Sequence, residues 1–276
     1  MNSIKSVDWL RARSEDRQVR VIDCRFRLDN PLYGQKAYES GHIPGAVYFD
    51  LDRDLSGHVS QHGGRHPLPD LRTFRDKLEL AGISNETEVI AYDDGDGAFA
   101  SRCWWLLTFM GHERVYILDG GMKEWQQAGY PVEEMRQEWK RSVFTPKVKE
   151  KMLASYDEVK KKSEDGSALL IDSRARPRYL GLEEPIDVRP GRIPGAINKE
   201  WTDSFHDGKW VHAEKQAERF AGLDRSEEII VYCGSGVTAI PNVIALLESG
   251  YENVKLYAGG YSDWVSYPDN PVSTGE

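Results

Sequence analysis

Cysteine is scarce in this sequence, and long apolar runs are missing. Among 276 residues only Cys24, Cys103 and Cys233 are cysteines, and their wide spacing argues against a disulfide framework or a CxxC metal site. No run of eighteen or more apolar residues occurs, and the first residues lack the basic-then-apolar pattern of a secretory signal. We therefore expect three free thiols in a cytoplasmic protein that contacts no membrane.

Positive charge is also in short supply. The formal net charge is -9 at pH 7, which argues against nucleic-acid binding and gives no general attraction for anions. Any anionic substrate therefore needs a local basic pocket. The sequence also has no P-loop, no GxGxxG unit and no zinc-spaced set of Cys and His, so we predict neither a nucleotide nor a metal cofactor.

The chain does contain an internal repeat. Its length suits two domains, and 39% hydrophobic with 29% charged residues is the composition of a folded protein. Four blocks of the first half return in the same order in the second. They are VIDCR at 21–25 and LIDSR at 170–174, GHIPGA at 41–46 and GRIPGA at 191–196, VIAY at 89–92 and IIVY at 229–232, GGMKEW at 120–125 and GGYSDW at 259–264.

Each half alternates short β-branched runs with helix-like stretches such as 101–110 and 242–249. This alternation predicts an α/β fold class, with a mainly parallel sheet flanked by helices in each of two tandem domains. Residues 133–152 are rich in charge and poor in apolar periodicity, which is typical of a linker. We expect a first domain at 1–135, a linker at 136–150 and a second domain at 151–276.

Cys233 opens a glycine-containing loop between a predicted strand and a predicted helix. Two glycines let the loop N–H groups point inward, and the helix adds its unpaired N–H groups and positive dipole end. Pro241 suits the first turn of that helix. Such a nest holds an anion. Five residues are therefore predicted to form an anion-binding loop, namely Gly234, Ser235, Gly236, Val237 and Thr238.

Cys233 is the predicted nucleophile of this loop. Because helix N-termini favour thiolates, Cys233 can attack the sulfane sulfur of a donor and carry it as a persulfide until an acceptor removes it. The matching loop of the first half begins with Asp93 and contains two further carboxylates, so this half is expected to carry no sulfur. Cys24 and Cys103 follow no glycine-rich loop and are interpreted as structural.

Two other cysteine chemistries fit less well. Cysteine phosphatases need a Cys-x5-Arg loop to clamp phosphate, and the sixth residue after Cys233 is Ala239. A cysteine protease needs a His base and a groove for its substrate, and no sequence pattern indicates the groove. Both alternatives rank below sulfur transfer.

The repeated blocks, the Cys-Gly-Ser-Gly-Val-Thr-Ala loop and the terminal GGxxxW resemble the rhodanese family over nearly the whole chain. The likeness is to its tandem form, in which only the second domain has the cysteine. Loops with two cations after the cysteine resemble thiosulfate enzymes, whereas the loop here resembles mercaptopyruvate enzymes. The resemblance implies sulfur transfer from 3-mercaptopyruvate to cyanide, a thiol or thioredoxin. Thiosulfate sulfurtransferase and a non-enzymatic protein-binding module are the alternatives, although such modules typically lack the loop cysteine.

The resemblance also implies roles for individual residues. Ser235 would donate a hydrogen bond to the donor sulfur or relay a proton, and His66 and Asp52 of the first half would approach it. Arg178 matches the position that binds the donor carboxylate, and Arg189 is a candidate second ligand. Alternatively, Asp52 only stabilises its loop and His66 is an exposed loop residue. Gly259 and Gly260 are interpreted as a turn, and Trp264 as a packed aromatic side chain. Arg174, Arg176 and Arg192 are interpreted as solvated charges on loops.

Overall fold

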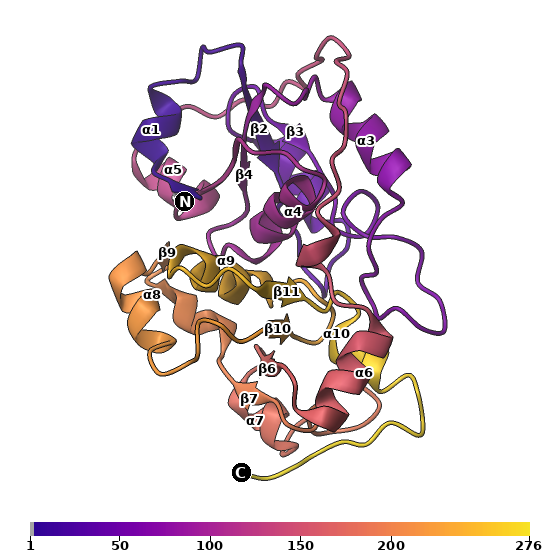
Figure 1. Ribbon diagram of the computed structural model, residues 1–276. Helices are drawn as coiled ribbons and strands as arrows, with labels where there is room; N and C mark the ends of the chain where they lie inside the picture. The colour runs from indigo at the N-terminus through magenta and orange to yellow at the C-terminus, as the bar shows by residue number, and fades with distance from the viewer. Residues whose placement is uncertain (1–2) are drawn as a thin grey trace.

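The computed structural model describes residues 3–276 and contains one parallel sheet in each half of the chain (Figure 1). The first sheet has the order β1-β5-β4-β2-β3 and the second the order β11-β10-β6-β7. The first comprises β1 (Ile4–Lys5), β2 (Val19–Asp23), β3 (Val47–Tyr48), β4 (Glu88–Tyr92) and β5 (Val115–Leu118), and the second β6 (Leu169–Asp172), β7 (Ile197–Asn198), β10 (Ile229–Tyr232) and β11 (Val254–Leu256). A short antiparallel hairpin joins β8 (Phe205–His206) and β9 (Lys209–Trp210). The predicted α/β fold class is confirmed.

Helices fill the connections between these strands, as right-handed parallel crossovers require. They are α1 (Val7–Arg11), α2 (Tyr33–Ser40), α3 (Leu71–Leu80), α4 (Ala98–Phe109), α5 (Gly121–Gln127), α6 (Tyr156–Asp165), α7 (Arg176–Leu180), α8 (Ala213–Arg219), α9 (Ile240–Glu248) and α10 (Gly260–Trp264), with 3-10 turns η1 (Glu150–Met152) and η2 (Trp201–Ser204). Within residues 3–276, none of these helices combines the length and apolar character needed to cross a bilayer.

The two halves are joined by helix packing at their centre. Figure 1 shows α4 of the first half facing α9 of the second, and these helices contact each other. Nearly every side chain of α4 is buried, because its own sheet covers one side and the second half covers the other. A single apolar cluster therefore runs through both halves, including Trp105 from α4 and Ile244 from α9. This shared core fixes the loops of one half against those of the other.

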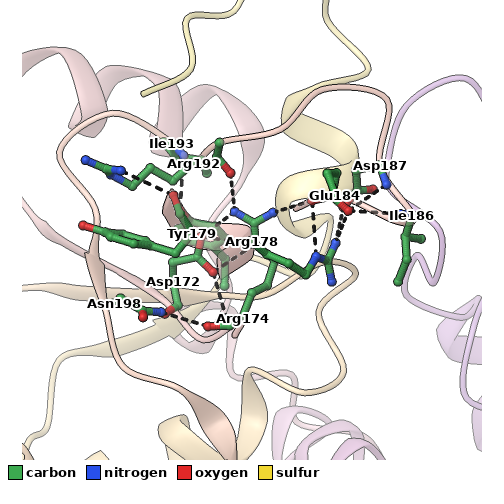
Figure 2. Close-up of polar contacts among 12 residues, drawn as sticks. Asp172, Arg174, Arg178, Tyr179, Glu184, Ile186, Asp187, Arg192, Ile193 and Asn198 are labelled. Carbon is green, nitrogen blue, oxygen red and sulfur yellow. Dashed lines mark hydrogen bonds and ion pairs between the residues drawn. The ribbon is translucent and has the colours of Figure 1, made fainter. Parts of the chain in front are cut away.

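Each repeated GxIPGA block lies over a buried ion pair. In the second half Arg174 binds Asp172 at 2.6 Å and the Gly191 carbonyl at 2.6 Å, and its side chain is 1% exposed (Figure 2). Arg192 is buried too and donates to the carbonyls of Tyr179 and Gly275. The prediction of solvated charge is therefore wrong for both arginines, because the loop folds over them and supplies their acceptors.

The segment predicted as a linker is packed along the first half. It contains no helix or strand between residues 134 and 149, but Phe144 is buried and stacks on His112. Farther along, the Lys147 and Lys149 N–H groups donate to carbonyls at the end of α4. The connection is thus packed against the first half and is not a flexible linker.

Candidate active site

The loop that follows β10 is enclosed on all sides. Cys233 is 1% exposed, and the loop residues through Val237 are buried. Gly236 has φ +70°, and a Cβ atom there would lie 2.1 Å from the Ala258 carbonyl oxygen, so only glycine fits. Pro241 lies in the first turn of α9, as predicted.

The backbone N–H groups of this loop have no hydrogen-bond acceptor within the described part of the protein. In the described part of the chain, the six N–H groups from Gly234 to Ala239 donate no hydrogen bond to a protein group. Buried N–H groups are rarely left unpaired, so an anion is the expected partner. The side chain that begins this cradle is Cys233, whose thiolate or persulfide carries one negative charge.

The equivalent cradle of the first half is filled by its own side chain. The Asp93 carboxylate accepts hydrogen bonds of 3.0 to 3.1 Å from the N–H groups of Gly95, Gly97, Phe99 and Ala100. Burial, with the nearby charge of Asp96, raises the pKa of Asp93 to about 7. With an internal carboxylate in place, this loop has no room for a sulfur anion.

Ser235, His66 and Asp52 form a chain that crosses between the two halves. Ser235 Oγ lies 2.8 Å from His66 Nδ1, and His66 Nε2 lies 3.5 Å from Asp52 Oδ1. The prediction that these three side chains approach one another thus agrees with the geometry, although Asp52 is half-exposed. Because a carboxylate faces Nε2, the proton of a neutral ring belongs on that atom, which leaves Nδ1 to accept the Ser235 hydroxyl.

His66 is held in its neutral form. Burial, together with the positive charges of Arg102 and Arg65, lowers the pKa of His66 to about 4. The ring can therefore accept a hydrogen bond from Ser235 at any pH near neutrality.

Arg102 is a buried cation beside the cysteine loop that the sequence-based reasoning missed. Its guanidinium donates to the carbonyls of Leu55, Gly236, His66 and Pro67 and forms no ion pair with any residue of 3–276. Burial lowers the pKa of Arg102 to about 10, and the charge of Cys233 acts in the opposite direction. A buried guanidinium without a carboxylate is costly, so its natural counter-charge is the anion on Cys233.

Arg178 and Arg65 lie against Gly234, next to the cysteine. A Cβ atom on Gly234 would be 2.7 Å from Arg65 Nη2 and 3.7 Å from both terminal nitrogens of Arg178. Arg178 also pairs with Glu184 at 2.7 Å and Asp187 at 2.9 Å (Figure 2). Arg178, the residue predicted to bind the carboxylate of the sulfur donor, thus lies beside the loop. Arg65 is a second cation there, which the sequence did not predict.

Arg189 is engaged elsewhere. Its guanidinium donates three hydrogen bonds, to the carbonyls of Tyr267, Pro268 and Asn270. These bonds hold Arg189 against the C-terminal segment, and its role as a second ligand of the sulfur donor stays a prediction. Cys24 and Cys103 are buried in the first half, and burial raises the pKa of the Cys24 thiol well above its usual range.

Comparisons with known proteins agree with this architecture. A family model described as a rhodanese-like domain matches residues 6–128 and again residues 155–267. The chain is 40% identical over 273 residues to a Pseudomonas aeruginosa protein named "Probable 3-mercaptopyruvate sulfurtransferase", covering 97% of this chain and 96% of that one. It is 31% identical to the Arabidopsis thaliana "Thiosulfate/3-mercaptopyruvate sulfurtransferase 1, mitochondrial", covering 99% of this chain and 78% of that one.

A solved structure is similar over the same length. The crystal structure of SseA from Escherichia coli, described as a 3-mercaptopyruvate sulfotransferase with the rhodanese fold, superposes with a TM-score of 0.84 at 33% identity. The match covers 95% of this chain and 100% of that one. Since the family model matches both halves and the likeness to relatives extends over nearly the full length, this chain belongs to the rhodanese family, with two rhodanese-like domains of which the second has the loop cysteine.

Proposed function

We propose that this chain is a sulfurtransferase that takes sulfur from 3-mercaptopyruvate onto Cys233 and passes it to a thiophilic acceptor. The single observation that carries the proposal is the 2.8 Å contact between Ser235 Oγ and His66 Nδ1, two residues from the cysteine. The names of the relatives from Pseudomonas aeruginosa and Arabidopsis thaliana also support it. The same enzyme is proposed to work in the cytoplasm.

In the first half-reaction the Cys233 thiolate attacks the thiol sulfur of the donor. The S–S bond forms while the C–S bond breaks, and its electron pair stays on carbon to give the enolate of pyruvate, which takes up a proton. Ser235 accepts the donor's thiol proton as its own hydroxyl proton moves toward His66. The loop N–H groups, which have no protein acceptor, and the Arg102 guanidinium stabilise the negative charge on sulfur throughout.

In the second half-reaction an acceptor nucleophile attacks the outer sulfur of the persulfide. The S–S bond breaks and its electron pair returns to Cys233, which restores the thiolate. Cyanide and small thiols meet this chemical requirement, and thioredoxin is proposed as a protein acceptor. The loop therefore supplies the nucleophile and the N–H groups, and His66 and Arg102 of the first half supply the proton acceptor and the positive charge.

Thiosulfate is the second candidate donor, and Arg65 and Arg178 are the observation that favours it. They supply two positive charges from outside the loop, where a dianion would need them. However, Asp187 contacts both arginines and Glu184 contacts Arg178, so these two carboxylates already balance the two guanidinium charges. A singly charged carboxylate donor is therefore the better match.

We expect the catalytic efficiency, kcat/KM, to be higher with 3-mercaptopyruvate than with thiosulfate. The measurement is a side-by-side assay of sulfur release from both donors, using one purified preparation at neutral pH and low salt. Low salt matters because screening would otherwise weaken the repulsion of a dianion. A higher efficiency with thiosulfate would make the chain a thiosulfate sulfurtransferase that uses Arg65 and Arg178 as its cations.

The pH dependence of kcat/KM tests the neutral state of His66. Because its pKa is lowered to about 4, we expect no loss of activity from His66 protonation as the pH falls from 8 to 5. Arg102 and Arg65 act against protonation, whereas Asp52 faces the other ring nitrogen. The profile of the His66→Gln variant provides the comparison. An inflection near pH 6.5 that disappears in this variant would contradict a neutral buried ring.

A further inference from the structure

The cysteine loop is covered in this structure, although its chemistry needs access for a donor. Cys233 and Gly234 are both buried, and the atoms nearest to a Cβ on Gly234 belong to the guanidinium groups of Arg65 and Arg178. These two side chains come from different halves of the molecule, Arg65 from the loop before α3 and Arg178 from α7. These two guanidinium groups therefore cover the loop beside the cysteine.

One carboxylate joins the two guanidinium groups. Asp187 Oδ1 contacts Arg65 Nη1, and Asp187 Oδ2 accepts from Arg178 Nη2 at 2.9 Å. Within residues 3–276 the two arginines are the only hydrogen-bond partners of the Asp187 carboxylate. It carries one charge on two oxygens, which is also the chemistry of an α-keto acid's carboxylate.

Glu184, the neighbouring acid, is fixed more firmly. It accepts from Arg174 at 3.1 Å, from Arg178 at 2.7 Å, and from two backbone N–H groups of its own segment. Figure 2 shows these contacts converging on Glu184 beside Asp187. Burial raises the pKa of Asp187, and the charge of Glu184 adds to this effect while Arg65 and Arg178 oppose it. Of the two carboxylates, that of Asp187 is therefore the easier one to displace from the arginines.

The part of the α7–β7 connection that carries Asp187 is lightly packed as far as Arg189, whose hydrogen bonds to the C-terminal segment hold its far end. Residues 182–188 contain no helix or strand, and Leu182 and Val188 are 74% and 81% exposed. Few buried apolar contacts hold such a segment, and local opening is cheapest at segments of this kind.

Arg65, in contrast, is anchored without Asp187. Its backbone N–H donates to Ser262 Oγ at 3.2 Å, and the N–H of Gly63 donates to Asp263 Oδ1 at 2.7 Å. His62 stacks on Tyr267 with ring centroids 3.9 Å apart. These contacts dock the backbone of this loop on the second half without the help of Asp187.

We propose that Arg65 and Arg178 bind the carboxylate of the donor as a pair, and that the donor enters by displacing the Asp187 carboxylate from them. The inference rests on the proposed function for the nature of the donor. It assigns Arg65 as a donor-binding residue and Asp187 as an internal competitor that lowers donor affinity. A planar monocarboxylate can replace Asp187 charge for charge, which a tetrahedral dianion cannot.

The test measures equilibrium binding of 3-mercaptopyruvate by calorimetry in a Cys233→Ser background, in which no sulfur can be transferred. We expect Arg65→Gln to weaken binding by about 10- to 150-fold, since a charge-assisted contact is lost. Asp187→Asn should tighten binding by about 10-fold, because the competitor loses its charge. This gain should shrink when both changes are combined, since both act on one site. Glu183→Gln, an exposed change on the same segment, should leave the Kd unchanged.

Three results would overturn the inference: no binding to the Cys233→Ser protein, an unchanged Kd in Arg65→Gln, or weaker binding in Asp187→Asn. Arg65→Lys keeps the charge and guards against misfolding; it should bind less tightly than the parent while unfolding at the same temperature. Turnover of the wild-type chain separates the two proposals. If 3-mercaptopyruvate binds with the expected pattern but yields no sulfur transfer, the proposed function fails and the binding site stands.

Discussion

Replacing Cys233 with serine is expected to abolish sulfur transfer from 3-mercaptopyruvate and from thiosulfate alike. A serine hydroxyl is not ionised near neutral pH and cannot hold a persulfide, while its size leaves the enclosed loop intact. The measurement is the rate of sulfur transfer, together with the intact mass of the protein after donor treatment. The wild-type chain should gain one sulfur that maps to Cys233, and the variant should gain none.

Cys24→Ala and Cys103→Ala are the matched controls, because both thiols are buried in the first half and neither belongs to the loop that follows β10. They should keep transfer activity per folded molecule, although the small cavities will cost some stability. A sulfur adduct on Cys24 or Cys103, or residual transfer by Cys233→Ser, would remove Cys233 from its assigned role.

Arg178→Ala is expected to reduce kcat/KM with 3-mercaptopyruvate by roughly 10- to 150-fold. Loss of a charged hydrogen-bond partner costs about 1.5 to 3 kcal/mol. The structure suggests the upper part of this range, because the change also leaves Glu184 and Asp187 short of one cation beside the loop. Their negative charge would then repel the donor carboxylate as well.

Arg176→Ala is the matched control for Arg178→Ala. The Arg176 side chain is 51% exposed and pairs with Glu276 on the surface, so its loss should change kcat/KM by less than about twofold. Steady-state kinetics of both variants decide the matter. If Arg178→Ala behaved like Arg176→Ala, Arg178 would have no part in donor binding.

Much of the fold could be predicted from the repeat alone. The four repeated blocks mark the central strands and the turns that follow them, and the strand-loop-helix pattern at Cys233 is local in sequence. Local patterns of this kind need only the periodicity of side chains and the turn chemistry of glycine and proline. Helix bounds were less exact, since α4 begins three residues before the apolar run was expected to start.

Contacts between the halves could not be predicted in the same way. His66 and Ser235 are 169 residues apart, and their contact depends on how α4 and α9 pack. His66 and Asp52 entered only through the family resemblance. Arg102 did leave a signal, as the only charge within an apolar helical run, whereas nothing local distinguishes Arg65 from other loop arginines.

The sequence does contain a signal for the buried arginines Arg25 and Arg174 of the first pair of repeated blocks. Arg174 follows Asp172 by two residues, and Arg25 follows Asp23 in the same way in the first half. A repeated Asp-x-Arg is better explained by an internal ion pair than by solvated charge, because solvent selects no spacing. Arg189 has no such counterpart, and its acceptors are backbone carbonyls that only the folded chain brings near.

The hydrogen bonds of Asp93 determine what it would take to build a reactive centre in the first half. An alanine at position 93 would leave several backbone N–H groups of the loop without a hydrogen-bond acceptor. The carboxylate of Asp93 cannot carry sulfur, and it accepts hydrogen bonds from those N–H groups. Restoring a reactive centre in the first half would therefore take more than returning a thiol to position 93, since the neighbouring Asp94 and Asp96 would still repel the sulfur anion.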